Sequence, residues 1–255
     1  MIKMGKIPRY FACGDLHGQL GLWNQIKEYL NPEDKLYFLG DAIDRGPHGY
    51  QIMKEILERP NTVYIKGNHE DMMYNALYEL LHDHSWTDNK YQWFRNGGGS
   101  TYEEIKNLDI EELLSTIAAM PTKYTLEING RIIYLTHAGF NPDSEILQYL
   151  EETRPEQAEN LYIWDRNHIS TKKWRGSYNE FCIHGHTPLS FIINNENKMI
   201  ETLNSGSLEE CNNMCRYCEG HKIDLDFGAP FIGFTGLFNL ETFELEKIFS
   251  APVER

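Results

Sequence analysis

Positive charge is scarce in this sequence. The 255 residues include 24 Lys and Arg against 38 Asp and Glu, which gives a formal net charge of −14. A surface of this sign repels nucleic-acid phosphates, so we expect no general affinity for DNA or RNA. The sequence also lacks the run of ~18 apolar residues that a membrane span needs, and its start does not resemble a signal peptide. We therefore expect a cytoplasmic protein with no membrane partner.

Cysteine is also infrequent. The chain has five cysteines and is long enough to bury a core of its own, so we expect reduced thiols and no disulfide framework. No internal repeat, low-complexity tract or linker divides the sequence. We therefore predict one domain over residues 1–255.

Short apolar runs alternate with stretches of helical periodicity in the first part of the chain. The apolar runs predict strands at residues 10–13, 36–39 and 62–65, and the periodic stretches predict helices at residues 19–30, 49–58 and 70–81. Residues 82–121 predict a mostly helical excursion. Strands are expected again at 132–135, 181–183, 231–238 and 243–249, with the last two as an antiparallel pair. This alternation predicts an α/β fold with strands packed between helices.

Five of the apolar runs end in Asp, Asn or His beside glycine. The five segments are Gly14-Asp15-Leu16-His17-Gly18, Gly40-Asp41-Ala42-Ile43-Asp44-Arg45-Gly46, Gly67-Asn68-His69-Glu70, Thr136-His137-Ala138-Gly139-Phe140 and His184-Gly185-His186-Thr187-Pro188. Loops at strand ends are where α/β proteins build their sites. Oxygen and imidazole ligands in such loops indicate a pair of divalent metal ions, the usual equipment for attack on a phosphate ester.

This ordered set of motifs resembles the phosphoprotein phosphatase family of dinuclear metallophosphoesterases. With the segment 162–166, it is most similar to the bacteriophage lambda-type serine/threonine protein phosphatases, and symmetrical diadenosine tetraphosphate hydrolases share the same core. The resemblance implies a single calcineurin-like metallophosphoesterase domain, folded as a four-layer α/β/β/α sandwich. It implies a metal-dependent hydrolase that acts on phosphoserine and phosphothreonine in proteins. A symmetrical bis(5'-nucleosyl)-tetraphosphate hydrolase is the alternative enzyme, and a catalytically dead binding module is the alternative of another class.

The resemblance also implies a role for each motif residue. Two metal ions would be held by Asp15, His17, Asp41, Asn68, His137 and His186, with Asp41 between them. These mixed ligands suit Mn²⁺, with Fe or Zn²⁺ as alternatives. A hydroxide shared by the two ions would attack phosphorus in line.

Four further motif residues would serve the substrate. His69 would be the general acid that protonates the leaving alkoxide, and Asp44 would hydrogen-bond its ring and hold it in place. Arg45 and Arg166 would grip the phosphoryl oxygens, a task for which the guanidinium fork is well shaped. The substrate is therefore expected to be a phosphorylated protein or a phosphorylated small molecule.

A second group of residues with metal-binding chemistry lies late in the chain. Cys211, Cys215 and Cys218 are followed by His221, and three Cys with one His are an acceptable tetrahedral Zn²⁺ set. A reduced loop in which the cysteines merely fall close together is the other interpretation, and the sequence leaves both open.

The remaining aromatic and thiol side chains have simpler interpretations. Trp23 and Trp93 are expected to pack and not to recognise a ligand. Cys13 and Cys182 lie inside apolar runs and are expected to be small buried hydrophobes.

Overall fold

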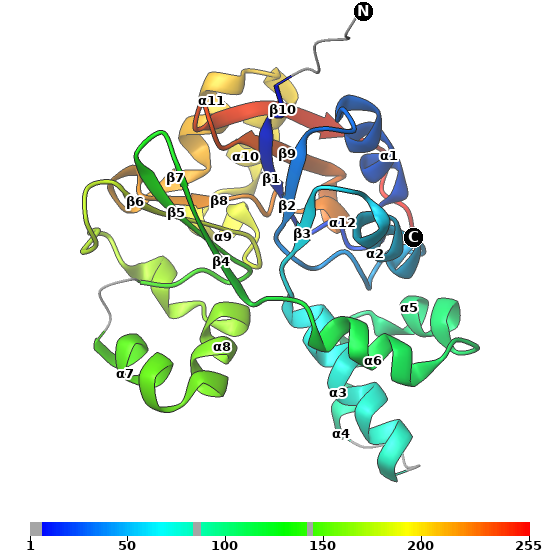
Figure 1. The fold of residues 1–255 in the computed structure, drawn as a ribbon. Helices are drawn as coiled ribbons and strands as arrows, with labels where there is room; N and C mark the ends of the chain where they lie inside the picture. The colour runs from blue at the N-terminus through cyan, green and yellow to red at the C-terminus, as the bar shows by residue number, and fades with distance from the viewer. Residues whose placement is uncertain (1–6, 84–87, 142–144) are drawn as a thin grey trace, which may run out of the picture.

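The computed structural model describes residues 7–83, 88–141 and 145–255 of the chain. Two five-stranded sheets pack against each other across a shared core at its centre (Figure 1). Sheet A has the order β10-β9-β1-β2-β3 and consists of β1 (Tyr10–Cys13), β2 (Lys35–Phe38), β3 (Thr62–Tyr64), β9 (Phe234–Asn239) and β10 (Glu244–Ser250). Sheet B has the order β4-β5-β6-β8-β7 and consists of β4 (Lys123–Ile128), β5 (Arg131–Thr136), β6 (Glu180–His184), β7 (Arg216–Tyr217) and β8 (Lys222–Asp224).

Both sheets are mixed. Strands β1, β2 and β3 run parallel to one another, as do β5, β6 and β8. β9 and β10 form the expected antiparallel pair at one edge of sheet A. Because parallel strands end at the same edge of a sheet, the loops that follow them gather on one side of each sheet.

Strands β1 and β5 pack on both faces, and their side chains alternate between neighbouring cores. Phe11 packs toward the helices outside sheet A, whereas Ala12 belongs to the core between the sheets. In β5, Ile133 belongs to that same central core, and Tyr134 packs against a third cluster with residues of α7 and α8. Helices α1 (Leu20–Tyr29) and α2 (Gly49–Glu58) cover sheet A, and α7 (Glu145–Thr153) and α8 (Pro155–Trp164) cover sheet B (Figure 1). The predicted four-layer α/β/β/α sandwich is therefore confirmed.

The helical excursion is also confirmed over the described part of 82–121. It consists of the end of α3 (Asn68–Asp83), then α4 (Asp88–Arg95), α5 (Gly98–Ile105) and α6 (Ile110–Ala118). Residues 84–87 of the predicted range lie outside the described residues. Figure 1 shows these helices as a group that extends away from the sandwich below β3.

Residues 229–239 differ from the predicted strand at 231–238. Phe231 and Ile232 belong to the short helix α12 (Ala229–Ile232), and the strand β9 begins only at Phe234. Pro230 lies in the first turn of α12, and Gly233 ends it with a φ of 72°. A proline that starts a helical turn and a left-handed glycine that ends it outweigh the strand preference of the aromatic residues.

The segment between β6 and β7, two strands of sheet B, is helical. It contains α9 (Leu189–Ile193), α10 (Glu196–Ser205) and α11 (Leu208–Met214), and two short 3₁₀ helices lie at Asn167–Ser170 and Cys218–Gly220. Cys13 and Cys182 are fully buried, as expected. Within the described residues, no helix combines the length and the apolar composition that a membrane crossing requires.

Candidate metal centre

Five loops converge where the parallel strands of the two sheets end. The loops after β1, β2 and β3 come from sheet A, and those after β5 and β6 come from sheet B. They bring together the six side chains that the resemblance implies as metal ligands: Asp15, His17, Asp41, Asn68, His137 and His186. All six are buried.

Asp41 lies at the centre of this group. Its Oδ2 is 3.5 Å from His17 Nε2, and its Oδ1 is 3.4 Å from His137 Nε2. Two sets of three residues hold their ligand atoms within 4.8 Å of one another, and Asp41 belongs to both, once with His17 and His69 and once with Asp15 and His137. A carboxylate in this position can serve two neighbouring cations.

The imidazoles of His17 and His137 are held by their second nitrogens. Nδ1 of His17 lies 2.9 Å from Ile43 O, and Nδ1 of His137 lies 2.7 Å from Leu39 O. Only an Nδ1–H can donate to a carbonyl oxygen, so Nε2 is the nitrogen of each ring that faces Asp41 and could bind a cation. Such backbone contacts fix the tautomer and the orientation of a metal-binding histidine.

Asn68 contacts the imidazole rings of both His137 and His186. Its Oδ1 is 2.9 Å from His137 Nε2 and 2.8 Å from His186 Nδ1. The backbone N–H of His186 donates to Asp15 Oδ1 over 3.0 Å. One chain of contacts therefore runs from sheet A to sheet B through polar groups alone.

The charge distribution of the cluster fits divalent cations. Asp15 Oδ2 is buried and has no hydrogen-bond partner among the described residues. Burial, followed by the charges of Asp226 and Asp41, raises the pKa of Asp15 well above its usual range. Burial would also raise the pKa of Asp41, but His137 and His69 hold it well below its usual range. An unpaired carboxylate oxygen among carboxylates and imidazoles is the donor set that first-row divalent metals take.

The backbone around this cluster is strained. Six residues of the metal-binding loops have a positive φ although they are not glycine: Asp15, His17, Asp41, Asp44, Arg45 and His186, with φ between 46° and 70°. Such conformations cost free energy and persist where the surroundings fix them, which is common at functional sites. Glycine is required where backbone meets carboxylate, since a Cβ on Gly185 would lie 1.8 Å from Asp15 Oδ2.

His69 stands beside the cluster and is held by Asp44. Its Nδ1 lies 2.7 Å from Asp44 Oδ2, while its Nε2 is 3.8 Å from Asp41 Oδ2. Asp44 is itself fixed by α4, because Trp93 Nε1 donates to both of its carboxylate oxygens at 3.1 and 3.0 Å. The Asp44 backbone N–H donates to Thr101 Oγ1 in α5. The helical excursion therefore orients the residue that orients His69.

Arg45 and Arg166 reach the cluster from two different loops, one after β2 and one after α8. Arg45 Nη1 lies 2.8 Å from His17 Nε2, and Nη2 lies 3.1 Å from His69 Nε2. Arg166 Nε donates to His186 Nε2 over 3.1 Å. Two guanidinium groups beside the cluster could neutralise the charge of a phosphoryl group.

Sequence reasoning missed three residues of this centre. Trp93 was expected only to pack, and nothing in the spacing of the sequence indicates its contact with Asp44. Glu70 stands in the Gly67–Glu70 motif, and its carboxylate accepts the N–H groups of Asp41, Ala42 and Gly67. Asp226 faces the cluster from the loop after β8, where burial raises its pKa to about 6.

The four residues of the possible zinc site are not brought together as a metal-binding group. All three cysteines are buried free thiols. Cys211 Sγ and Cys215 Sγ each contact a backbone oxygen, of Thr202 and Asn212. The ring of His221 is stacked on Trp174 at 5.0 Å, and its Nδ1 contacts Glu180 O. The metal-binding groups found among the described residues contain no cysteine, so structural Zn²⁺ at this cluster stays a prediction.

Known proteins resemble the chain in sequence and in fold. Residues 8–228 match the family model described as calcineurin-like phosphoesterase. The chain is 32% identical over 142 residues to serine/threonine-protein phosphatase 2 of Escherichia coli, which covers 54% of this chain and 61% of that protein. It is 24% identical over 205 residues to the asymmetrical bis(5'-nucleosyl)-tetraphosphatase PrpE of Halalkalibacterium halodurans, which covers 71% and 79%.

A solved structure agrees with the fold. A protein serine/threonine phosphatase from Saccharomyces cerevisiae superimposes with a TM-score of 0.54 at 15% identity, and the match covers 97% of this chain and 81% of that one. The chain spans about three fifths of the length of the E. coli relative. The family model covers most of the sequence. The chain therefore belongs to the calcineurin-like phosphoesterases.

Proposed function

We propose that the cluster around Asp41 is a dinuclear metal centre that hydrolyses phosphate esters. Asp15 and His17 would hold one cation, Asn68, His137 and His186 the other, and Asp41 both. The observation that carries this proposal is the buried and unpaired Oδ2 of Asp15 among two further carboxylates. When bound, the cations supply Lewis-acid stabilisation of the phosphoryl oxygens and activate a water as nucleophile. Mn²⁺ is the metal to test first, with Fe and Zn²⁺ next.

His69 would give a proton to the leaving group. Its Nδ1 is occupied by Asp44, so Nε2 is the nitrogen that can exchange a proton with a substrate. Asp44 holds the plane of the ring and fixes the direction of Nε2. Because Trp93 holds both Asp44 oxygens, the carboxylate has little freedom to turn away.

Arg45 and Arg166 would orient the phosphoryl group. Each now contacts an imidazole nitrogen at the edge of the cluster. A planar guanidinium can offer two parallel N–H groups to two phosphoryl oxygens, which fixes the phosphorus relative to the cluster. Arg45 would also bring the phosphate close to His69, which its Nη2 already contacts.

Two substrate classes follow from the relatives. A phosphoserine or phosphothreonine protein is the first, because the motifs and the name of the E. coli relative agree on it. A dinucleoside polyphosphate is the second, and it is favoured by the name of the PrpE relative and by a cavity beside Arg45.

The experiment measures hydrolysis and metal content together. Purified protein is freed of metal, loaded with Mn²⁺, and assayed on β-glycerophosphate, a phosphoserine peptide and diadenosine tetraphosphate. We expect turnover only in the metal-loaded protein, with about two ions bound per chain. Metal-independent turnover, or an Asp41→Asn variant that keeps both metal and activity, would disprove the proposal.

A further inference from the structure

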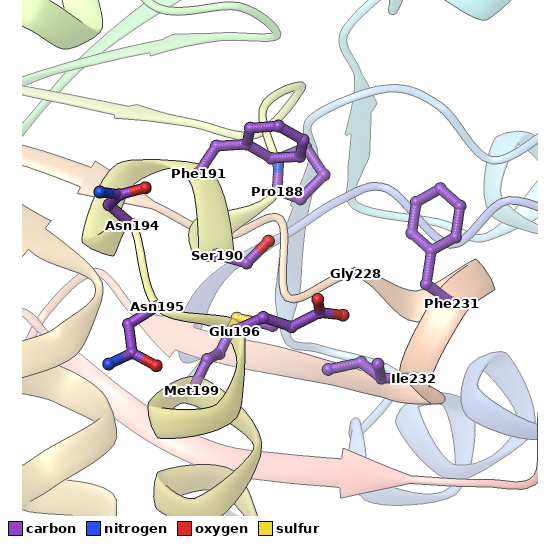
Figure 2. A pocket seen from close by; sticks show the side chains of 10 residues that line it. All are labelled: Pro188, Ser190, Phe191, Asn194, Asn195, Glu196, Met199, Gly228, Phe231 and Ile232. Carbon is purple, nitrogen blue, oxygen red and sulfur yellow. The ribbon is translucent and has the colours of Figure 1, made fainter.

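A cavity of about 500 Å³ lies beside the metal centre. Its lining comes from α9, the start of α10 and α12, as Figure 2 shows. Pro188 in its wall follows His186 by two positions, and Gly228 follows Asp226 by two. The loops that carry metal-centre residues therefore continue directly into this cavity. Its volume lies within the range of small-molecule sites, roughly 300–1,000 Å³.

One side chain connects the cavity with the expected phosphate position. The guanidinium carbon of Arg45 lies 5.4 Å from the centre of the Phe231 ring, which lines the cavity. The nitrogens of the same guanidinium contact His17 and His69. A ligand with its phosphate at Arg45 would therefore place the group attached to that phosphate next to Phe231.

Two aromatic rings at the cavity are exposed. Phe191 is 71% exposed and Phe231 is 61% exposed. Figure 2 shows the two rings at separate positions on the rim, one on α9 and one on α12. Exposed apolar rings beside a site commonly mark a ligand surface. A planar ring is a good partner for them, since stacking needs only a π face.

The cavity also offers polar groups without partners. Among residues 7–83, 88–141 and 145–255, no group hydrogen-bonds to the side chains of Ser190, Asn194 or Glu196. Asn195 differs, because its Oδ1 accepts the backbone N–H of Lys198. An amide and a carboxylate are the side chains that pair with the donor and acceptor edge of a nucleobase.

The charges of Glu196 and Arg45 determine which end of a ligand would enter the cavity. The Glu196 carboxylate would repel a phosphate placed in the cavity, and the phosphate would find its countercharge at Arg45 instead. An apolar peptide side chain would use the rings but leave the amide and the carboxylate without partners after they lose water. A nucleobase uses both the rings and the polar groups.

We propose that this cavity binds the base of a nucleotide substrate whose phosphate lies at Arg45. The proposal rests on the function proposed above, because the same metal centre would cleave the bound phosphate. It favours the second of the two substrate classes proposed above, nucleotides with a chain of phosphates.

The test compares substrates with and without a base. The Mn²⁺-loaded protein is assayed on diadenosine tetraphosphate, on inorganic tripolyphosphate and on β-glycerophosphate. We expect Phe191→Ala to lower kcat/KM for diadenosine tetraphosphate about tenfold, which is the scale of one lost base stack, and to leave the two base-free substrates within about twofold. Phe191→Trp should keep the activity on the dinucleotide. Tyr178→Ala is the matched control, since Tyr178 is an 89% exposed aromatic residue that does not line the cavity.

Binding provides a readout that does not depend on turnover. By titration calorimetry, AMP should bind about tenfold more tightly than ribose 5-phosphate, and Phe191→Ala should remove the difference. Equal affinity for the two ligands in the unaltered protein would overturn the base site, even if β-glycerophosphate is hydrolysed. The reverse result, a preference for AMP without hydrolysis of any ester, would support the base site and refute the proposed function. A preference for phosphopeptides with a flanking Phe that Phe191→Ala abolishes would assign the cavity to peptides and overturn the proposal.

Discussion

At the scale of single residues, the hydrogen-bond partners of His69 differ from those of the histidines that we propose as metal ligands. His69 Nδ1 is held by Asp44, and its Nε2 faces Arg45 at 3.1 Å. His17 and His137 are held instead by backbone carbonyls and face Asp41. The contacts of Nδ1 therefore differ between His69, which we propose as the proton donor, and the two histidines that we propose as metal ligands.

The His69→Asn variant tests that division. We expect kcat to fall by about 10²–10⁴-fold, because the leaving group loses its proton donor, while bound Mn²⁺ stays unchanged. Steady-state kinetics and metal analysis of the same sample provide the two measurements. A variant with unchanged kcat would remove His69 from the mechanism, and one without metal would make it a ligand.

Trp93 offers a sharper test of positioning. Replacing it by Phe keeps a buried ring but removes the N–H that holds both oxygens of Asp44. We expect a fall in kcat of about tenfold with little change in KM or metal content, because a loosened Asp44 lets His69 lose its direction. Trp23→Phe is the matched control, since Trp23 is equally buried and donates to Glu55 instead. Equal losses in both variants would show a general packing effect.

At the scale of elements, the cluster depends on the close approach of the loop after β6 to the loop after β1. The loop after β6 passes Asp15 with no room for a side chain, since a Cβ on Gly185 would meet Asp15 Oδ2 at 1.8 Å. We expect Gly185→Ala to displace that carboxylate and weaken Mn²⁺ binding at least tenfold, as measured by titration. Gly99→Ala is the control, because only Phe94 lies within 4 Å of its added Cβ. Unchanged metal affinity in Gly185→Ala would show that Asp15 is not a ligand.

A buried carboxylate also stabilises the end of sheet A that lies opposite the loops of the cluster. Asp34 accepts hydrogen bonds from the backbone N–H groups of Arg9 and Asn31 and pairs with the Arg9 guanidinium at 2.7 Å. Burial alone would raise the pKa of Asp34, but these partners hold it below its usual value. We expect Asp34→Asn to lower the free energy of unfolding at pH 7 by roughly 2 kcal/mol.

The direction of this pKa shift determines how the stabilisation by Asp34 depends on pH. Because the folded-state pKa of Asp34 is below its unfolded value of ~3.9, the stabilisation is complete above that value and is lost as the pH falls through the folded-state pKa. Denaturation curves at several pH values should therefore bring the Asp34→Asn variant and the unaltered protein together in acid. A constant difference down to pH 2 would contradict this account.

These elements also show what the sequence can and cannot predict. The strands that precede the five motifs were predictable, because each is a short apolar run that leads into a motif with glycine. The strand predicted over 231–238 was partly wrong, because Pro230 and Gly233 enclose a helical turn that apolar periodicity does not reveal. The contact between Trp93 and Asp44 joins positions 49 apart. Local pattern carries no information about which distant donor reaches a carboxylate, so that part of the site required the fold.

At the scale of the whole molecule, the proposed metal centre lies where the two sheets meet and contains carboxylates that no group among the described residues fully neutralises. Asp15 comes from sheet A and His186 from sheet B, and they meet through a backbone hydrogen bond at the cluster. Without metal, burial and then the charges of Asp226 and Asp41 raise the pKa of Asp15, and a buried carboxylate without a countercharge costs stability. Cations that bind only the folded state offset this cost and stabilise the entire sandwich.

The Asp15→Asn variant should therefore change stability in opposite directions with and without metal. In a chelator, we expect its Tm to equal or exceed that of the unaltered protein, because the substitution removes a buried charge that faces Asp41 and Asp226. At a Mn²⁺ concentration about a hundredfold above Kd, the unaltered protein should gain about 5–10 °C, and the variant should gain little. Asp34→Asn is the control, since it should lower Tm equally under both conditions. If Mn²⁺ raised the Tm of Asp15→Asn as much as that of the unaltered protein, the unpaired oxygen of Asp15 would have no role in holding a cation.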